Sequence, residues 1–143
     1  MMKLPNGSER NSMRIHQKFL DAACAEAKVS IGKGGVGVGA VMVKNGTIVA
    51  RSHDRTIQLN DPIAVAEVDC IRIAGRRNDQ SELTLYSSRY PDMLCAGTVL
   101  QFSIGSMVIG LEELESSELT LLKGKGVPVV FCLHDRCKEL AQA

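Results

Sequence analysis

The sequence predicts an α/β protein, a three-layer α-β-α sandwich built on a five-stranded mixed sheet. Two β-type segments joined by Asn45-Gly46 predict a hairpin, because both residues tolerate the positive φ angles of a tight turn. After the hairpin, helix-type and strand-type segments alternate to the end of the chain, which is typical of strands joined by crossover helices. A length of 143 residues and a hydrophobic content of 45% suit one domain with a full core. We therefore expect helices on both faces of the sheet.

The first half of the chain predicts a flexible arm, two helices and the hairpin. Residues 1–10 are polar and contain Pro and Gly, so they are expected to form the arm in front of a single domain, 11–143. Ser12 can cap the first helix, and Asp61-Pro62 has the composition of a helix start. The expected elements are a helix from residue 11 or 12 to the glycines that begin at 32, strands over 36–44 and 47–51, a polar loop over 52–60, and a helix over 61–75.

The second half of the chain predicts three strands, each followed by a helix. A charged segment, 76–82, precedes them, and Pro91 is expected to open the helix after the first of these strands. Glycines at 124 and 126 turn the chain before the last strand. The expected elements are strands over 83–88, 106–111 and 127–133, and helices over 91–102, 112–123 and 135–143.

Composition excludes several classes of function. The formal net charge is +1 with both signs interspersed, and aromatic residues make up only 3% of the chain. Neither property favours a nucleic-acid partner or an anionic membrane surface, so we expect neither. No apolar run is long enough to cross a membrane. The N-terminus is polar and the five cysteines are scattered, which predicts a cytoplasmic protein with reduced thiols.

Several segments resemble the cytidine/cytosine deaminase-like superfamily, most closely its branch of cytosine, guanine and tRNA-adenosine deaminases. They occur in the family's order and at its intervals, and they cover roughly residues 12 to 142. The segments are 34–41, 61–67, 83–88, 91–97, 101–105 and 135–138. The resemblance implies the family fold, a five-stranded sheet between helices, which agrees with the pattern of elements above.

The resemblance also implies a set of site residues. The family uses His-x-Glu on one helix and Pro-Cys-x-x-Cys on the next, where the His and both Cys hold Zn²⁺ and the Glu transfers protons. Glu67 falls on the proton-transferring position, and Cys95 falls on the second thiolate ligand. Val65 and Asp92 occupy the other two ligand positions.

Two ligand positions depart from the family pattern, which puts the metal in doubt. Val65 has no donor atom, and a tetrahedral catalytic zinc needs three protein ligands plus water. The sequence therefore predicts a protein without the family's zinc cofactor. A rebuilt zinc site from Asp92, Cys95 and His53, or with Cys70 in place of His53, is the alternative.

The remaining candidates are expected to line the substrate pocket. Asp54 stands where family members carry a base-contacting Asn; an ionised carboxylate only accepts hydrogen bonds, so a ligand with more N–H donors or a positive charge is implied. Near the start of its helix, Cys95 is either a thiolate or a buried apolar residue, and Asp92 is either a site residue or a helix cap. The expected pocket-lining residues are His53, Asp54, Val65, Ala66 and Tyr90.

Three functions are compatible with this pattern. The first is a metal-independent hydrolase that acts on a C–N bond of a small nitrogen heterocycle. In this enzyme Glu67 is the general acid/base, and either Cys95 or a water activated by Asp92 and Glu67 is the nucleophile. The second is a catalytically inactive binding or structural protein with the same fold. The third is a zinc-dependent nucleobase deaminase with a rebuilt site. The resemblance implies a homodimer in each case.

Overall fold

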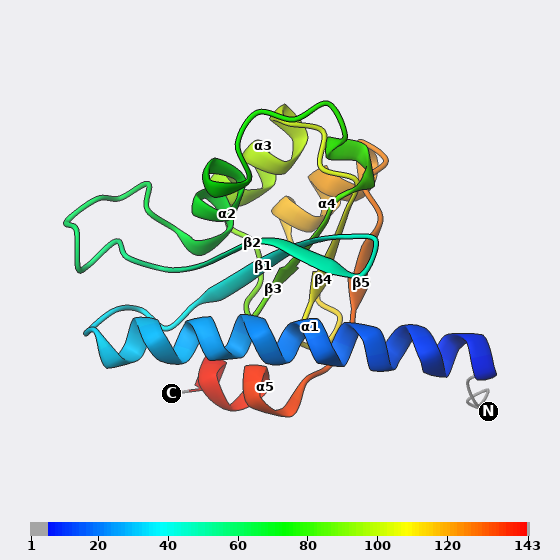
Figure 1. Ribbon diagram of the computed structural model, residues 1–143, viewed down its shortest axis with the longest axis horizontal. Helices are drawn as coiled ribbons and strands as arrows, with labels where there is room; N and C mark the ends of the chain where they lie inside the picture. The colour runs from blue at the N-terminus through cyan, green and yellow to red at the C-terminus, as the bar shows by residue number, and fades with distance from the viewer. Residues whose placement is uncertain (1–5, 143) are drawn as a thin grey trace.

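A five-stranded mixed sheet lies between two layers of helices in the computed structural model, which describes residues 6–142 (Figure 1). The order of strands across the sheet is β2-β1-β3-β4-β5. The strands are β1 (Gly39–Lys44), β2 (Thr47–His53), β3 (Thr84–Ser87), β4 (Ser106–Ile109) and β5 (Val129–Phe131). Strand β1 pairs antiparallel with both β2 and β3, whereas β3, β4 and β5 are parallel to one another. The predicted mixed five-stranded sheet is confirmed.

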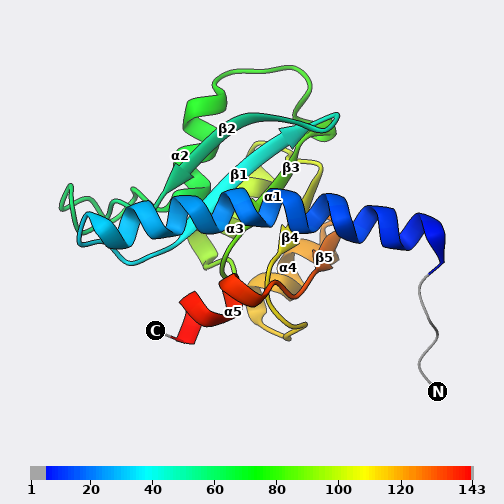
Figure 2. The ribbon, with the colours of Figure 1, turned by 60° about the horizontal axis from the view of Figure 1, so that its bottom comes forward.

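The helices form one layer of two and another of three. Figures 1 and 2 show α1 and α5 together on one face of the sheet, and α2, α3 and α4 on the other. The helices are α1 (Gly7–Gly32), α2 (Ala66–Ala74), α3 (Met93–Gln101), α4 (Ser117–Gly124) and α5 (Asp135–Gln142), with a short 3₁₀ turn at Gln80–Glu82. This arrangement is the predicted three-layer sandwich. Within the described part of the chain, no helix combines the length and the apolar character that a membrane crossing requires.

The hairpin turn has the predicted conformation. Asn45 and Gly46 both have positive φ, 49° and 76°, which matches the right-handed twist of the flanking strands. The returning strand β2 continues to His53, two residues further than expected. This extension places Asp54 at the carboxyl end of β2, beside the loop that leads to α2.

Helix α1 begins earlier than expected. Asn6 caps it: its side chain accepts the backbone N–H of Glu9 at 2.8 Å, and the Glu9 carboxylate accepts the backbone N–H of Asn6 at 3.1 Å. Residues 7–10 therefore belong to the helix instead of an arm, while residues 1–5 of the expected arm lie outside the described residues.

Helix α2 begins later than expected, and this correction places the site. The Asp61 carboxylate accepts the backbone N–H of Ile63 at 2.9 Å, which closes a tight turn where a helix start was predicted. Val65 is extended and forms the N-cap, so the helix begins at Ala66. Glu67 is consequently in the first turn of α2, with its side chain against the end of the sheet.

Two other helices also begin after the predicted residue. Helix α3 starts at Met93, because Asp92 caps it and Pro91 lies outside. Helix α4 starts at Ser117 behind the cap Ser116, so the acidic segment before it is not helical. In both cases a residue with a capping side chain determines the start.

Candidate functional site

Glu67 is a buried carboxyl group at the carboxyl end of the sheet's central strand. Its side chain comes from the first turn of α2, and the residue is only 5% exposed. The Ser87 hydroxyl, at the end of β3, donates a hydrogen bond to Oε1 at 2.8 Å. Burial raises the pKa of Glu67 to about 7; hydrogen bonds from its own backbone and from Ser87 oppose the rise, and the charges of Asp92 and Asp54 add to it. The group therefore titrates near neutrality, as a proton-transferring residue should.

Asp92 and Cys95 lie beside Glu67 at the start of α3. The Asp92 carboxylate caps the helix and accepts the backbone N–H of Cys95 at 2.8 Å. Cys95 has no exposed surface, and burial, followed by the charges of Glu67 and Asp92, raises the pKa of its thiol well above the usual range. Burial and the two carboxyl groups therefore outweigh the lowering of the thiol pKa that a helix N-terminus would cause, and the Cys95 side chain is a neutral thiol.

Asp54 is the third acidic residue near Glu67. It is buried, and its Oδ1 accepts the backbone N–H of Thr56 at 3.0 Å and the Thr56 hydroxyl at 2.6 Å. These bonds shape the turn after β2 and hold the carboxylate at the edge of the site. Its charge contributes to the raised pKa of Glu67, so the two carboxyl groups face a common region.

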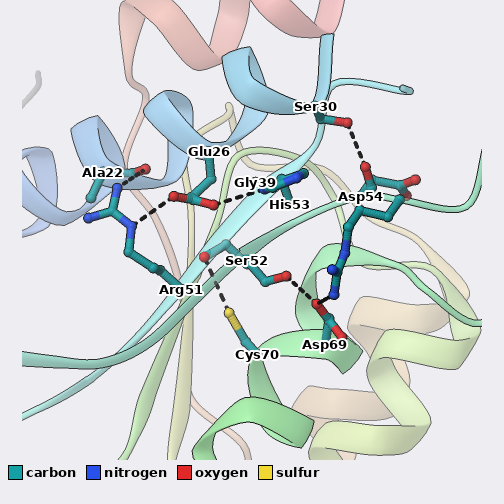
Figure 3. A network of polar contacts seen from close by, with 12 residues as sticks. Ala22, Glu26, Ser30, Gly39, Arg51, Ser52, His53, Asp54, Asp69 and Cys70 are labelled. Carbon is teal, nitrogen blue, oxygen red and sulfur yellow. Dashed lines mark hydrogen bonds and ion pairs between the residues drawn. The ribbon is translucent and has the colours of Figure 1, made fainter. Parts of the chain in front are cut away.

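His53 does not join this group. Figure 3 shows its ring turned toward α1, where Nδ1 lies 3.0 Å from a carboxylate oxygen of Glu26. No hydrogen bond or ion pair found over residues 6–142 connects His53 with Glu67, Asp92 or Cys95. The reason is strand geometry: successive side chains of β2 point to opposite faces of the sheet, and His53 faces the α1 layer.

The other predicted pocket residues occupy different environments. Val65 is half-buried at the N-cap of α2, next to Glu67. Ala66, next to Glu67 at the start of α2, has no exposed surface and packs in the core. The Tyr90 hydroxyl donates to the backbone carbonyl of Glu112 at 2.6 Å, tying the segment before α3 to the loop after β4.

The residues at the family's metal position do not fit a zinc ion. Val65 supplies no donor atom and the Asp92 carboxylate is engaged as a helix cap, which leaves Cys95 as a single remaining ligand of the motif. The alternative set of Asp92, Cys95 and His53 does not converge, because His53 lies on the other face of the sheet.

A different group of metal-ligating side chains is present, which the sequence analysis missed. Cys24, His134 and Cys137 offer ligand atoms that all lie within 4.8 Å of one another. This group argues against the expectation of a chain without a metal cofactor. The spacing Cys132-x-His134-x-x-Cys137 was the available signal.

Sequence reasoning also missed the polar network that supports α2. Asp69 is buried and accepts a hydrogen bond from the Ser52 hydroxyl at 2.5 Å (Figure 3). It also accepts hydrogen bonds from Arg72 at 2.8 Å and from Arg55. Burial alone raises the pKa of Asp69, but these three donors lower it below its usual value. The network fixes the loop after β2 against the helix that carries Glu67.

Comparisons with known proteins agree with this geometry. The family model described as "Cytidine and deoxycytidylate deaminase zinc-binding region" matches residues 13–111. The chain is 40% identical over 81 residues to a tRNA-specific adenosine deaminase of Aquifex aeolicus, covering 54% of each protein. It is 27% identical over 127 residues to a cytosine deaminase of Candida albicans, covering 87% of this chain and 85% of that protein. The chain spans less than two thirds of the length of most of the curated relatives that it matches.

A solved structure shares the fold over most of the chain. It comes from a study of A-to-I editing by tRNA:A34 deaminases, and its TM-score is 0.72 at 25% sequence identity. The superposition covers 87% of this chain and 97% of that one. Glu67 and its neighbours thus stand in the fold of known deaminases, with a changed set of side chains around them.

Proposed function

This chain belongs to the cytidine and deoxycytidylate deaminase family, and we propose that it is a hydrolytic deaminase acting on a small nitrogen heterocycle, with Glu67 as its general acid/base. The observation that carries the proposal is the state of Glu67: it is buried, it accepts a hydrogen bond from Ser87, and its pKa is about 7. A carboxyl group poised in this way can accept and donate a proton at neutral pH, which is the optimum for acid/base catalysis.

In the proposed reaction, water replaces an amino group on an electron-poor ring carbon. The Glu67 carboxylate takes a proton from the water as its oxygen bonds to the carbon, and Glu67 then passes that proton to the amino group. The C–N bond breaks and ammonia leaves; the second water proton moves from the new hydroxyl to the adjacent ring nitrogen, so a carbonyl remains. Water is favoured over Cys95 as the nucleophile because the buried Cys95 thiol holds its proton.

No step of the proposed reaction passes through a metal at the family's position, because Val65 and the capping Asp92 do not suit one. The family's zinc lowers the pKa of bound water, and that contribution is missing here. The substrate should therefore be more electrophilic than an ordinary cytosine ring.

The charges around Glu67 indicate the substrate's polarity. Asp54 and Asp92 both act electrostatically on Glu67, and neither forms an ion pair in the described part of the chain. Carboxylates accept hydrogen bonds only. They favour a heterocycle rich in N–H groups, or one with a positive charge such as a protonated amidine. Relatives named for tRNA make a base within RNA the competing substrate class.

Ammonia release from a panel of amino-substituted heterocycles tests the proposal. The panel should include electron-poor rings, cytosine, guanine, and an adenosine-containing tRNA anticodon stem-loop. We expect turnover on an electron-poor ring, a loss of about 10²-fold or more in Glu67→Gln, and near-normal activity in Cys95→Ala. Full activity in Glu67→Gln would refute the role of Glu67, and loss of activity in a folded Cys95→Ala would make the thiol the nucleophile.

A second candidate function is a binding protein without turnover. The observation that favours it is the absence of exposed surface on Cys95 together with the use of Asp92 as a helix cap. A panel compound that raises the melting temperature of wild type without releasing ammonia would support this function. We also infer that the partner of this chain is a second copy of itself, in line with the expected homodimer.

A further inference from the structure

Three metal-ligating side chains meet on the face of the sheet opposite Glu67. Cys24 comes from the middle of α1, His134 directly precedes α5, and Cys137 lies in the first turn of α5. The Sγ atoms of the two cysteines are 2.8 Å apart, and Cys24 Sγ is 3.7 Å from His134 Nδ1. All three residues are buried. Two segments that are more than a hundred residues apart in sequence thus place soft ligand atoms together.

The ring of His134 is oriented for ligation. Its Nε2 lies 2.6 Å from the carboxylate of Asp21, one turn before Cys24 on α1, so Nε2–H is the donor to that carboxylate. Nδ1 then carries the lone pair of the ring; it lies beside Cys24 Sγ and accepts a long hydrogen bond from the backbone N–H of Cys137 at 3.3 Å. A bound ion would take this lone pair from the N–H. A histidine held by a carboxylate through one nitrogen, with the lone pair of the other nitrogen directed into the ligand cluster, is the usual arrangement at protein zinc sites.

The backbone around the cluster leaves room for the sulfur. A Cβ atom at Gly110 would lie 2.6 Å from Cys137 Sγ, so only glycine fits at this position after β4. The carbonyl of Gly110 also accepts the backbone N–H of His134 at 3.0 Å, which fixes the histidine's main chain to the sheet. The end of β4 therefore supports both α5 ligands.

The chemistry of the ligand atoms indicates which metal the cluster would take. Thiolate and imidazole are soft to borderline ligands, which suit zinc and do not suit magnesium or calcium. Cys132 is buried nearby, but it lies outside the three-residue cluster, and its Sγ accepts a hydrogen bond from Gln17 on α1 at 3.3 Å.

We propose that Cys24, His134 and Cys137 bind a zinc ion that fastens α5 to α1, with Asp21 orienting the histidine. Ligation displaces the thiol protons, and the burial of all three ligands makes the site structural. Asp21, His134 and Cys24 are also linked as carboxylate, imidazole and thiol, the sequence of groups found in a catalytic triad. A nucleophilic role for Cys24 is not supported, because its side chain has no exposed surface and the sheet separates α1 from the helix that carries Glu67.

Metal analysis of the full-length protein tests this site. The protein is purified under reducing conditions without chelator, and zinc is counted per chain by mass spectrometry. We expect one ion per chain in wild type, none in Cys24→Ser or Cys137→Ser, and one in the control Cys70→Ser. Cys70 is an equally buried thiol that donates a hydrogen bond to the Ala40 carbonyl in β1 at 3.2 Å. Zinc that persists in both ligand variants would overturn the proposal.

A second control separates this site from the family's metal position. The double variant Asp92→Asn/Cys95→Ala should keep its zinc; loss of the ion there would place it at the motif instead. Because ligand variants can fail to fold, wild type is also titrated with Co²⁺ after removal of zinc. The proposal predicts a thiolate-to-cobalt charge-transfer band and tetrahedral d–d bands at one equivalent. The absence of these bands, or a Cys24–Cys137 disulfide in reduced preparations, would contradict it.

The positioning role of Asp21 has its own measurement. Asp21→Asn should weaken zinc affinity by about 10–100-fold while leaving one ion per chain at saturation. A chelator competition measures the affinity. Unchanged affinity would remove Asp21 from the site, and a failure to bind any zinc would show that the carboxylate is itself a ligand.

Discussion

Glu67 shows how a family residue can be kept while its surroundings change. Its carboxyl group is buried beneath α2 with two further acidic residues, Asp54 and Asp92, and with a serine as hydrogen-bond donor. In the family pattern a metal ion would supply positive charge here. Burial, with a smaller contribution from these negative charges, instead raises the pKa of Glu67 to about 7, so the residue's function depends on burial and on its acidic neighbours.

The raised pKa of Glu67 predicts a pH-dependent stability. The folded pKa of about 7 lies above the ordinary value of 4.5, so the folded state binds the proton more tightly than the unfolded state does. The stabilisation is complete below pH 4.5 and is lost as pH rises through 7, by about 3 kcal/mol in total. Glu67→Gln should remove this slope and exceed wild type in stability at pH 8, as measured by urea unfolding across this pH range. Parallel pH profiles of the two proteins would contradict the raised pKa, and the exposed Glu115→Gln serves as control.

The two roles of Asp92 can be separated by substitution. Asp92→Ser retains a capping side chain but removes the charge, whereas Asp92→Ala removes both. We expect Asp92→Ala to lose about 1 kcal/mol of unfolding free energy and Asp92→Ser to lose a few tenths. The pKa of Glu67, followed by carboxyl NMR, should fall in both variants because a neighbouring negative charge is gone. A pKa that does not move would mean that Asp92 acts only as a cap.

At the scale of elements, the position of α2 depends on Asp69. This one carboxylate accepts hydrogen bonds from Ser52 in β2, from Arg55 in the following loop, and from Arg72 one turn further along α2. It thereby joins strand, loop and helix at a single buried point. Glu67 lies half a turn away on the same helix, so its placement relies on this network.

Asp69→Asn should therefore destabilise the protein by about 1–3 kcal/mol at pH 7, because buried donors of Arg55 and Ser52 lose a charged acceptor. The lowered pKa of Asp69 gives the sign of the pH effect: its stabilisation is present above the ordinary value of 3.8 and disappears as pH falls below that value. Urea unfolding of wild type and Asp69→Asn at pH 7 and pH 3 measures the loss of stability and its pH dependence, with Glu115→Gln as the control. An equal deficit at the two pH values would contradict the ionic character of the network.

The element order and sheet type could be predicted from the sequence, whereas several helix starts could not. Strand periodicity and the Asn45-Gly46 turn depend on neighbouring residues, so local patterns reveal them. Asp61-Pro62 has the composition of a helix start, but its carboxylate closes a turn on Ile63, and α2 begins behind Val65, which has no capping side chain. Tertiary contacts of the loop decide that boundary. In contrast, the Asn6–Glu9 capping box can be recognised from the sequence, because a capping Asn is followed three residues later by Glu.

At the scale of the whole molecule, the sheet separates two polar sites. Glu67, Asp92 and Asp54 could be proposed from the family pattern, because the motif spacing identifies them. The direction in which the His53 side chain points could not be predicted in this way, since it depends on which face of β2 each residue occupies. The Cys24–His134–Cys137 cluster joins residues far apart in sequence, and only the fold brings α1 and α5 together. Topology thus determines which of the candidate side chains can act as a unit.

We propose that the α2–α3 side of the molecule carries the surface for the inferred second copy. A cavity of about 550 Å³ opens between these helices, lined by apolar residues such as Leu83 and Phe102 together with several arginines. Phe102 lines this cavity and still exposes nearly half of its surface. Apolar side chains exposed around a cavity of this kind are typical of a surface that another chain covers.

Phe102→Lys should convert the expected homodimer to a monomer. The new charge would lie among Arg72, Arg76 and Arg77, which line the same cavity, so it adds repulsion as well as removing apolar contact. Size-exclusion chromatography with light scattering over a range of concentrations measures the change. Met13→Lys is the matched control, since Met13 is equally exposed but lies on α1, across the sheet. A wild type that stays monomeric at every concentration would contradict the homodimer. A dimer that dissociates in Met13→Lys and persists in Phe102→Lys would place the interface elsewhere.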